Sequence, residues 1–284
     1  MSKRTNRNSD SGPIFSLSEV SAMHLLVVDW DYFFPTPAAG GPQGPHDDLF
    51  KWAVAEDEFH TETIWEARHR DFTAAGVELP QVTGWRGFWR RFRFSAGTVL
   101  VYADSNAWAG LLWPSDLGRA EEHWDSVHLY DAHHDAGYRQ NHRSFEQWRT
   151  SGDGIRCESW MLAHHWAGAS LHVRFPPWRQ SLDRPREEPL VPVDMTIDDG
   201  QPPTAAFDLV FVCRSGAWVP PWCDGAFTEF LHSAPLPKTV FGRNRWVHPR
   251  PDPARMAKVK RGLYAKVEEM NRAGVGEAPG GGRE

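Results

Sequence analysis

Acidic and imidazole side chains follow three short apolar stretches of the chain, and their types suit metal chemistry. Asp29 and Asp31 follow the stretch MHLLVV, residues 104–106 (DSN) follow TVLVYA, and residues 131–135 (DAHHD) follow SVHLY. Carboxylates with one imidazole and no thiolate suit a hard or borderline divalent ion, Mn²⁺ or Mg²⁺ before a structural zinc. Four aspartates and one histidine exceed what one ion usually takes from a protein, so the set favours two ions about 3.5–4 Å apart.

The apolar stretches that precede these groups have the character of strands buried on both faces. Strands are predicted at 23–29, 98–104, 126–131, 169–175 and 207–213. Helices are predicted at 61–76, 84–92, 144–149, 157–169, 224–233 and 253–271. Strands alternating with helices predict an α/β protein with a three-layer α/β/α arrangement and a mostly parallel sheet. In such sheets the functional site lies beyond the carboxyl ends of the strands, so the three polar clusters are expected to converge.

Spacing within each cluster determines which side chains can share a site. Asp29 and Asp31 lie two residues apart, so both would point to one side of an extended strand. Asp131 and Asp135 would lie roughly 13 Å apart on an extended strand, too far for one small ion cluster. The backbone is therefore expected to turn soon after Asp131 and to bring His133 and Asp135 back towards it.

Composition limits the remaining classes of function. The 284 residues carry a formal net charge of −6 at pH 7, whereas tracking a nucleic-acid backbone needs a basic patch, so no nucleic-acid partner is expected. No apolar run approaches the roughly 20 residues of a membrane helix, and the polar start lacks the apolar core of a signal peptide. Three scattered cysteines do not form a disulfide framework. These features predict a cytoplasmic protein without a membrane partner.

One domain is expected between two polar tails. Residues 1–21 are rich in Ser, Asn and Arg and residues 272–284 are rich in Gly, so both are predicted to be disordered. Residues 22–271 contain no linker long enough to separate domains and are expected to form a single α/β domain. The proline-rich stretch at 181–194 is interpreted as a loop of this domain.

Two of the polar clusters resemble motifs of a known superfamily. DAHHD at 131–135 resembles the DAHxD metal motif of the arginase/deacetylase (ureohydrolase) superfamily, and VVDWDYFF resembles its D-x-D followed by an aromatic residue. More closely, the chain resembles the branch with the peptide arginases, which convert arginine side chains of peptides to ornithine. The resemblance runs from about residue 23 to 232, with further matches at CESWM, LHVRFPPWR and FVCRSGAWVPPWCD. It implies an arginase-like fold for the domain.

The order of the motifs and one ligand differ from the arginase pattern. The D-x-D motif precedes DAHHD here and follows it in arginases, but a site built from strand ends depends on spatial adjacency. The resemblance implies six ligands for two Mn²⁺ ions: Asp29, Asp31, Asn106, Asp131, His133 and Asp135. The first aspartates of the two motifs, Asp29 and Asp131, would bridge the two ions. Asn106 replaces a histidine of the family and is a weaker ligand. One ion, or Zn²⁺ or Fe²⁺ in place of Mn²⁺, therefore remains open.

Water on such ions has a lowered pKa and can attack a guanidinium or amide carbon at neutral pH. The leaving amine then needs a proton, for which His134, His164 and His165 are the candidates. A guanidinium pairs with a carboxylate through two parallel donors. Glu158 is the candidate for that carboxylate, since the family carries a substrate-binding Glu on a comparable segment. An acid that complements the dipole of the predicted helix is the equally simple interpretation of Glu158.

Three more candidates for substrate binding lie at the same expected edge of the sheet. Arg214 and Ser215 directly follow a predicted strand, and Trp218 is a candidate wall of the cleft, with packing of a proline-rich turn as the alternative. Asp198 and Asp199 are weaker candidates for the substrate carboxylate, because the sequence IDDGQPP is typical of a turn.

Three functions are compatible with these residues. The first is a metal-dependent amidinohydrolase that releases urea from a peptide arginine or an arginine-like small molecule. The second is a deacetylase or other amidase with one ion on the same scaffold, and the third is a non-catalytic, metal-stabilised peptide-binding domain. The five predicted carboxylate and imidazole ligands favour a catalytic protein over a binding domain. A carboxylate that pairs with the substrate favours a guanidinium over an acetylated lysine, which has no charge to pair. The choice of guanidine and the oligomeric state have no readable signal in the sequence.

Overall fold

The structure of the chain, a computed structural model, describes residues 22–36, 58–179 and 188–240, together with Lys258, Arg261 and Ala265. For residues 58–63 it describes the backbone alone. The predictions for the tails at 1–21 and 272–284 lie outside the described residues. So do most of the predicted helix at 253–271 and the first part of the predicted loop at 181–194.

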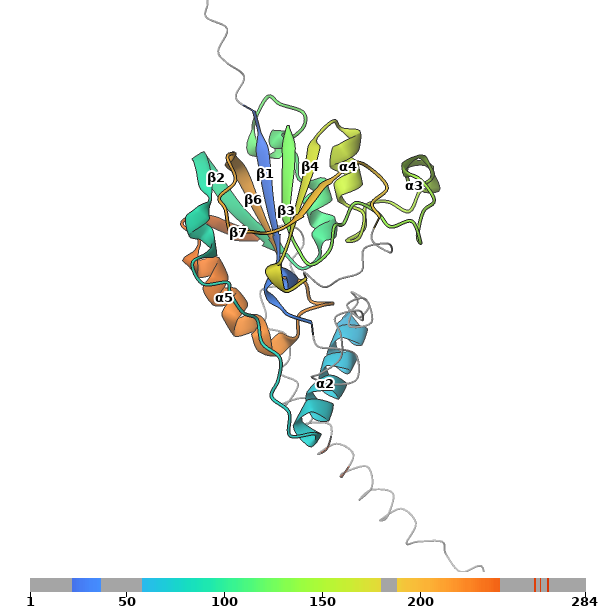
Figure 1. Cartoon of the computed structure of the whole chain (residues 1–284), viewed down its shortest axis with the longest axis vertical. Coiled ribbons are helices and arrows are strands. Elements are labelled where there is room, and N and C mark those ends of the chain that lie inside the picture. Colours follow the sequence, from blue (N-terminus) through green and yellow to red (C-terminus); the bar gives the residue numbers. More distant parts are fainter. Residues whose placement is uncertain are drawn as a thin grey trace, which may run out of the picture.

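Seven parallel strands form one sheet, in the order β5-β4-β3-β1-β6-β2-β7 (Figure 1). The strands are β1 (His24–Asp29), β2 (Arg93–Ala103), β3 (Ser126–Tyr130), β4 (Ser170–Phe175), β5 (Asp194–Ile197), β6 (Ala206–Cys213) and β7 (Lys238–Val240). The chain leaves β1 for β2 on one side of the sheet and leaves β3 for β4 on the other. Ligands of open α/β sheets bind beyond the carboxyl ends of two neighbouring strands whose connections lead to opposite edges of the sheet. β1 and β3 are such a pair, so their ends mark the expected position of a site.

The α/β class and the parallel sheet are confirmed, and the five predicted strands are present. β5 and β7 were not predicted, because they have only four and three residues and no apolar run. β2 begins earlier than predicted, since Arg93 and Phe94 already pair with β6 before an irregularity that precedes Val99. Among the described residues no helix has the length and apolar character needed to cross a bilayer.

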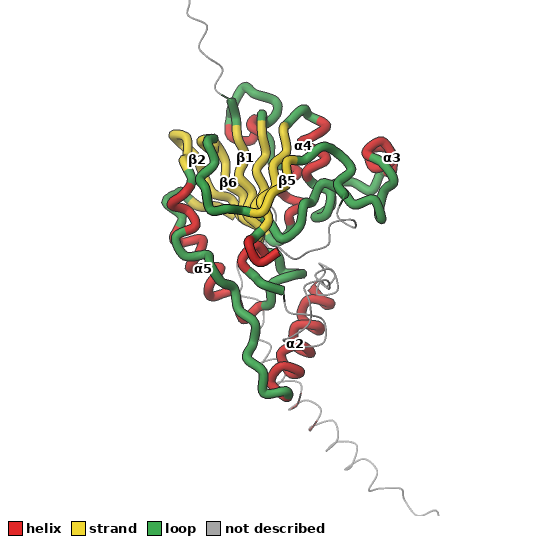
Figure 2. Tube along the Cα trace, in the orientation of Figure 1, coloured by secondary structure: helices red, strands yellow, loops and turns green. Residues whose placement is uncertain are grey.

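Within residues 22–36, 58–179 and 188–240, four α-helices accompany the sheet: α2 (Glu58–Ala74), α3 (Phe145–Ser151), α4 (Met161–Trp166) and α5 (Asp224–Ser233). The helix predicted at 84–92 is wrong, and Figure 2 shows mostly loop between α2 and β2. Gly84 and Gly87 adopt positive φ there, so only the 3-10 turn η3 (Phe88–Arg91) forms. The helix predicted at 157–169 is shorter than expected and begins at Met161.

Alternate residues of β1 point to opposite faces of the sheet, and both faces are buried. Leu26 and Val28 pack with side chains of η3 and α5, whereas Leu25 and Val27 pack with side chains of α4 and the segment before β3. Helical segments therefore cover both faces, as expected for three layers. This arrangement explains why the strands have nearly continuous apolar sequences.

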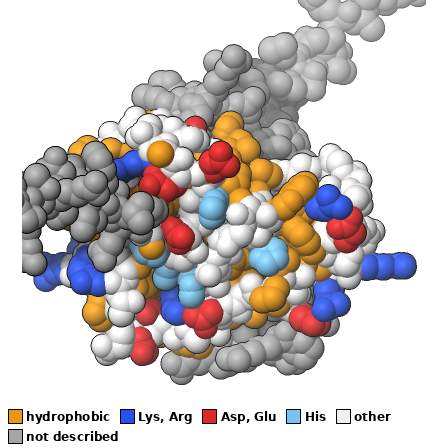
Figure 3. Space-filling model, turned by 90° about the horizontal axis from the view of Figure 1, so that it is seen from above, with side chains coloured by type: hydrophobic (Ala, Val, Ile, Leu, Met, Phe, Trp, Pro, Cys, Tyr) orange, Lys and Arg blue, Asp and Glu red, His pale blue; other side chains and the backbone are white. Residues whose placement is uncertain are grey.

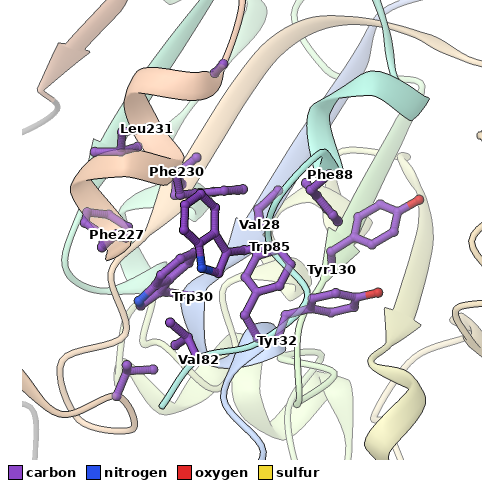
Figure 4. Packing of buried hydrophobic residues seen from close by; sticks show 14 of the residues in the cluster. Val28, Trp30, Tyr32, Val82, Trp85, Phe88, Tyr130, Phe227, Phe230 and Leu231 are labelled. Carbon is purple, nitrogen blue, oxygen red and sulfur yellow. The ribbon is translucent and has the colours of Figure 1, made fainter. Parts of the chain in front are cut away.

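An aromatic cluster anchors the end of β1 (Figure 4). Trp30 follows β1 directly, and its ring lies 5.0 Å from that of Phe230 on α5. Phe230 in turn stacks on Trp89 of η3 at 4.6 Å. Trp30 stands between Asp29 and Asp31 in the sequence, so the burial of its ring limits where these two carboxylates can lie.

Phe230→Ala is expected to lower the free energy of unfolding by about 3–5 kcal/mol, because the buried ring is lost and a cavity remains. Chemical denaturation measures this change. Glu229→Ala on the same helix is the control, since Glu229 forms an exposed ion pair with Arg86, and such pairs contribute about 0–1 kcal/mol. Equal losses in the two variants would contradict the placement of Phe230 in the core.

Candidate metal centre

Polar side chains from the ends of β1, β2 and β3 converge at the carboxyl edge of the sheet. Two come from β1 and the 3-10 turn η1 (Trp30–Phe33), one from the start of the turn η4 (Asn106–Leu111), and three from the loop after β3. Each is buried, with 1% to 6% of its surface exposed: Asp29, Asp31, Asn106, Asp131, His133 and Asp135. The structure thus brings together all six ligands that the resemblance implied.

The loop after β3 turns sharply, as the spacing predicted. β3 ends at Tyr130, and the Asp131 carboxylate accepts the backbone N–H of His133 at 2.7 Å. Asp135 adopts a φ of 48°, which is uncommon for a residue other than glycine. Ser215, which follows β6, is the other such residue in the described part of the chain, with a φ of 58°. Backbone strain of this kind is concentrated at functional sites.

Asp31, Asp131 and His133 form a group that could hold a metal ion, because their ligand atoms lie within 4.8 Å of one another. The Nδ1 atom of His133 lies 2.9 Å from the Asp31 carboxylate and 3.3 Å from that of Asp131. Two carboxylates and one imidazole are compatible with Mn²⁺, Fe²⁺ and Zn²⁺. The geometry therefore fits an ion but does not by itself select which one.

Asn106 contacts the carboxylates on the other side of Asp131. Its side-chain nitrogen donates to Asp29 at 2.6 Å, to Asp131 at 3.1 Å and to Asp135 at 2.9 Å. Its Oδ1 atom is buried and has no hydrogen-bond partner among the described residues. The amide is therefore oriented with its donor group towards three acidic side chains.

Two further side chains support the centre and were not singled out from the sequence. The Trp160 indole donates to Asp135 at 2.8 Å. The buried Arg179 donates to the carbonyl of Ala132 and lies 4.3 Å from the ring of Phe175. A buried indole N–H needs an acceptor, but every buried tryptophan has this requirement, so it does not single out Trp160 in the sequence.

The pKa values of the acidic groups differ with their surroundings. Burial, together with neighbouring carboxylates, raises the pKa of Asp29 and that of Asp131 well above the ordinary range. Burial also raises the pKa of Asp135, to about 7. For Asp31 the effect of burial is outweighed by His133, which holds its pKa below the ordinary value. The cluster therefore favours bound protons or a bound cation.

The predicted proton donors lie in surroundings that keep them neutral. His134 is fully buried, accepts the N–H of Ala136 at 3.1 Å, and has its pKa lowered by burial to about 3. His164 is also buried, contacts the carbonyl of Ala109 at 3.0 Å, and has a pKa of about 4 for the same reason. Neither carries an extra proton at pH 7, which does not support them as general acids.

His165 is partly exposed, and burial lowers its pKa. Its ring packs edge-on against Phe145 at 5.4 Å. Within the described part of the chain, His165 contacts none of the six converging side chains. Its catalytic role remains a prediction.

The predicted substrate residues divide into two groups. Glu158 is half-buried, and its backbone carbonyl accepts the N–H of Gly137, two residues after Asp135. Trp218 lies at the centre itself, with its ring 3.9 Å from that of His133. Arg214 lies buried between Asp104 at 3.3 Å and Asp224 at 3.1 Å, and its role in substrate binding stays a prediction.

Ser215 and the two weaker candidates are also placed. Ser215 is buried shortly after β6, and its hydroxyl oxygen has no hydrogen-bond partner among the described residues. Asp198 is buried and accepts from Tyr32 and from Arg91, at 2.5 Å in the latter case. Asp199 is exposed and accepts the N–H of Gln201, as expected in a turn. Asp198 therefore ties segments of the fold together.

The amino edge of the sheet is also rich in histidine. Figure 3 shows this edge, from the side where β1 begins. His24 and His128 lie 2.7 Å and 2.8 Å from the hydroxyl of Ser126, and the rings of His128 and His172 stack at 4.4 Å. This cluster lies at the opposite end of the strands from the carboxylates. Histidine is therefore not confined to the candidate centre.

No protein-family model, curated protein or solved structure matches the chain. The fold and the site consequently define its class without help from relatives. It is an α/β protein with a parallel seven-stranded sheet and a buried candidate metal centre beyond the ends of β1 and β3.

The raised pKa of Asp135 predicts how the stability of metal-free protein depends on pH. Its folded pKa of about 7 lies above the ordinary 3.8, so the folded state binds the proton more tightly and loses this stabilisation as pH rises. The difference in unfolding free energy between wild type and Asp135→Asn is expected to fall by about 2 kcal/mol from pH 5.5 to pH 7.5. Denaturation with a chelator present measures it.

The buried histidines titrate in both proteins, and their effect on the unfolding free energy has the opposite pH dependence to that of Asp135. Taking the difference between wild type and Asp135→Asn cancels this effect. Asn also tolerates positive φ, so the backbone at position 135 is not disturbed. A difference that does not change with pH would contradict the raised pKa of Asp135.

Proposed function

We propose that the chain is a metal-dependent hydrolase of the ureohydrolase type. It would release urea from an arginine residue of a peptide, or from an arginine-like small molecule, and leave ornithine. The observation that carries this proposal is the burial of Asp31, Asp131 and His133 together beyond the carboxyl ends of the neighbouring strands β1 and β3. These residues belong to the two motifs that resemble the arginase/deacetylase superfamily.

A divalent ion, Mn²⁺ in the first instance, would be held by Asp31, Asp131 and His133. When bound, it would lower the pKa of a water molecule and supply a nucleophile at neutral pH. Asp31 suits this role because its carboxylate oxygen lies within 4.8 Å of the ligand atoms of Asp131 and His133. The Trp218 ring covers His133, and Arg179 holds the carbonyl of Ala132 beside it.

Glu158 is the residue that best suits a guanidinium substrate. It precedes Trp160 by two residues, and the Trp160 indole contacts Asp135. Its half-buried carboxylate accepts from Cys157 at 3.3 Å, so it can also take a cationic donor. A guanidinium presents two donors to a carboxylate, whereas an acetylated lysine has no charge to pair.

A second candidate is a metal-dependent deacetylase or other amidase with a single ion. The observation that favours it is that the described residues contain one compact group of metal-ligating acids and histidine. The two candidates differ in product, since an amidinohydrolase releases urea and a deacetylase releases acetate. A non-catalytic, metal-stabilised peptide-binding domain would release neither.

Asp131→Asn is expected to abolish both metal loading and urea release, because Asp131 contacts both His133 and Asn106. Elemental analysis and a urea assay with arginine-containing peptides and Mn²⁺ measure the two effects. Asp199→Asn is the matched control, since Asp199 lies in an exposed turn. Normal metal content in Asp131→Asn would refute its role as a ligand, and acetate from acetyl-lysine peptides would favour the deacetylase.

Glu158→Gln is expected to raise KM for an arginine peptide about 10- to 100-fold, because the side chain keeps its shape and loses its charge. Steady-state kinetics measures KM, and metal content should stay at the wild-type level. An unchanged KM would show that Glu158 does not bind the guanidinium.

A further inference from the structure

The six converging side chains separate into two sets that share Asp131. The Oδ1 atom of Asp131 faces His133, at 2.7 Å from its backbone nitrogen and 3.3 Å from Nδ1. The Oδ2 atom of Asp131 faces the opposite way and accepts from Asn106 at 3.1 Å. Asp31 lies with His133 on the first side, and Asp29 and Asp135 lie with Asn106 on the second. One carboxylate thus connects two positions at which positive charge is favoured.

The second position is already filled by a donor group of the chain. The Asn106 nitrogen has three carboxylate oxygens around it, at 2.6 Å, 3.1 Å and 2.9 Å. Three acidic groups around one point favour a cation there. The NH₂ group carries partial positive charge, and the reverse orientation of the amide would place its oxygen against all three.

The carboxylates of the second set are also committed to other donors. Asp135 accepts from Trp160 at 2.8 Å through the same oxygen that contacts Asn106. The other oxygen of Asp29 accepts the backbone N–H of Asp31 at 3.2 Å. These two acids therefore act as hydrogen-bond acceptors for Asn106 and its neighbours, whereas the ligand atoms that lie within 4.8 Å of one another belong to Asp31, Asp131 and His133.

We propose that the side-chain amide of Asn106 takes the place of a second cation, so that this centre binds one divalent ion, at Asp31, Asp131 and His133. The inference rests on the metal site of the proposed function, and it replaces the two-ion site that the resemblance implied. Asp29 and Asp135 then orient Asn106 and do not bind the ion.

Substitution of Asn106 tests this directly. Asn106→His adds an imidazole ligand, and Asn106→Asp adds a carboxylate while removing the donor that the other three acids share. Both changes are expected to create a second ion site. Asn106→Leu has a similar size, adds no ligand and keeps the position of the second cation filled, now with an apolar side chain, so it is the matched control and should not gain an ion.

The experiment is a count of Mn²⁺ per chain at saturation, by elemental analysis of the full-length protein after equilibration with Mn²⁺. Wild type and Asn106→Leu should bind about one ion, and Asn106→Asp and Asn106→His should bind about two. Electron paramagnetic resonance should show an isolated Mn²⁺ in wild type and a spin-coupled pair in the two variants.

Two ions in wild type would overturn the proposal, as would no ion at all, or one ion in both Asn106→Asp and Asn106→His. If Asn106→His fails to fold, Asn106→Asp, which has nearly the same size, and the wild-type count still decide. One ion in wild type without urea release would leave this inference standing and would refute the proposed function alone.

Discussion

Four aspartates lie buried together where the ends of β1 and β3 meet, and each of them loses hydration and repels its neighbours. Much of the surrounding structure supplies donors that offset this cost. Backbone N–H groups contact three of the acids, and the side chains of Asn106 and Trp160 contact the fourth, Asp135. The backbone groups, the Asn106 amide and the Trp160 indole are all uncharged. The remaining deficit of positive charge is the physical reason to expect a bound cation.

A cluster of like charges keeps its shape only within a rigid scaffold. The apolar strands bury both faces of the sheet, and Trp30 fixes the end of β1 in an aromatic cluster. The next turn is held by Tyr32, whose hydroxyl donates to the buried Asp198, and Asp198 also pairs with Arg91 at 2.5 Å. The position of Asp31 is thus determined by residues from several separate segments of the chain.

The sheet and the convergence of the acids could be predicted because both depend on local patterns. Apolar runs identify buried strands, and parallel strands bring their carboxyl ends to one edge. The role of Trp160 could not be predicted, because its indole meets Asp135 across 25 residues. The position of Arg214 directly after β6 could be predicted, whereas its ion pairs with Asp104 and Asp224 could not. Such pairings between distant segments leave no periodic signal in the sequence.

The central claim is that this buried cluster is a metal centre. Anomalous diffraction at the manganese absorption edge, from crystals grown with Mn²⁺, tests it most directly. We predict one strong anomalous peak within bonding distance of Asp31, Asp131 and His133, with Asn106 still in contact with Asp29 and Asp135. The absence of a peak at these residues in a well-ordered, Mn²⁺-soaked crystal would contradict the claim.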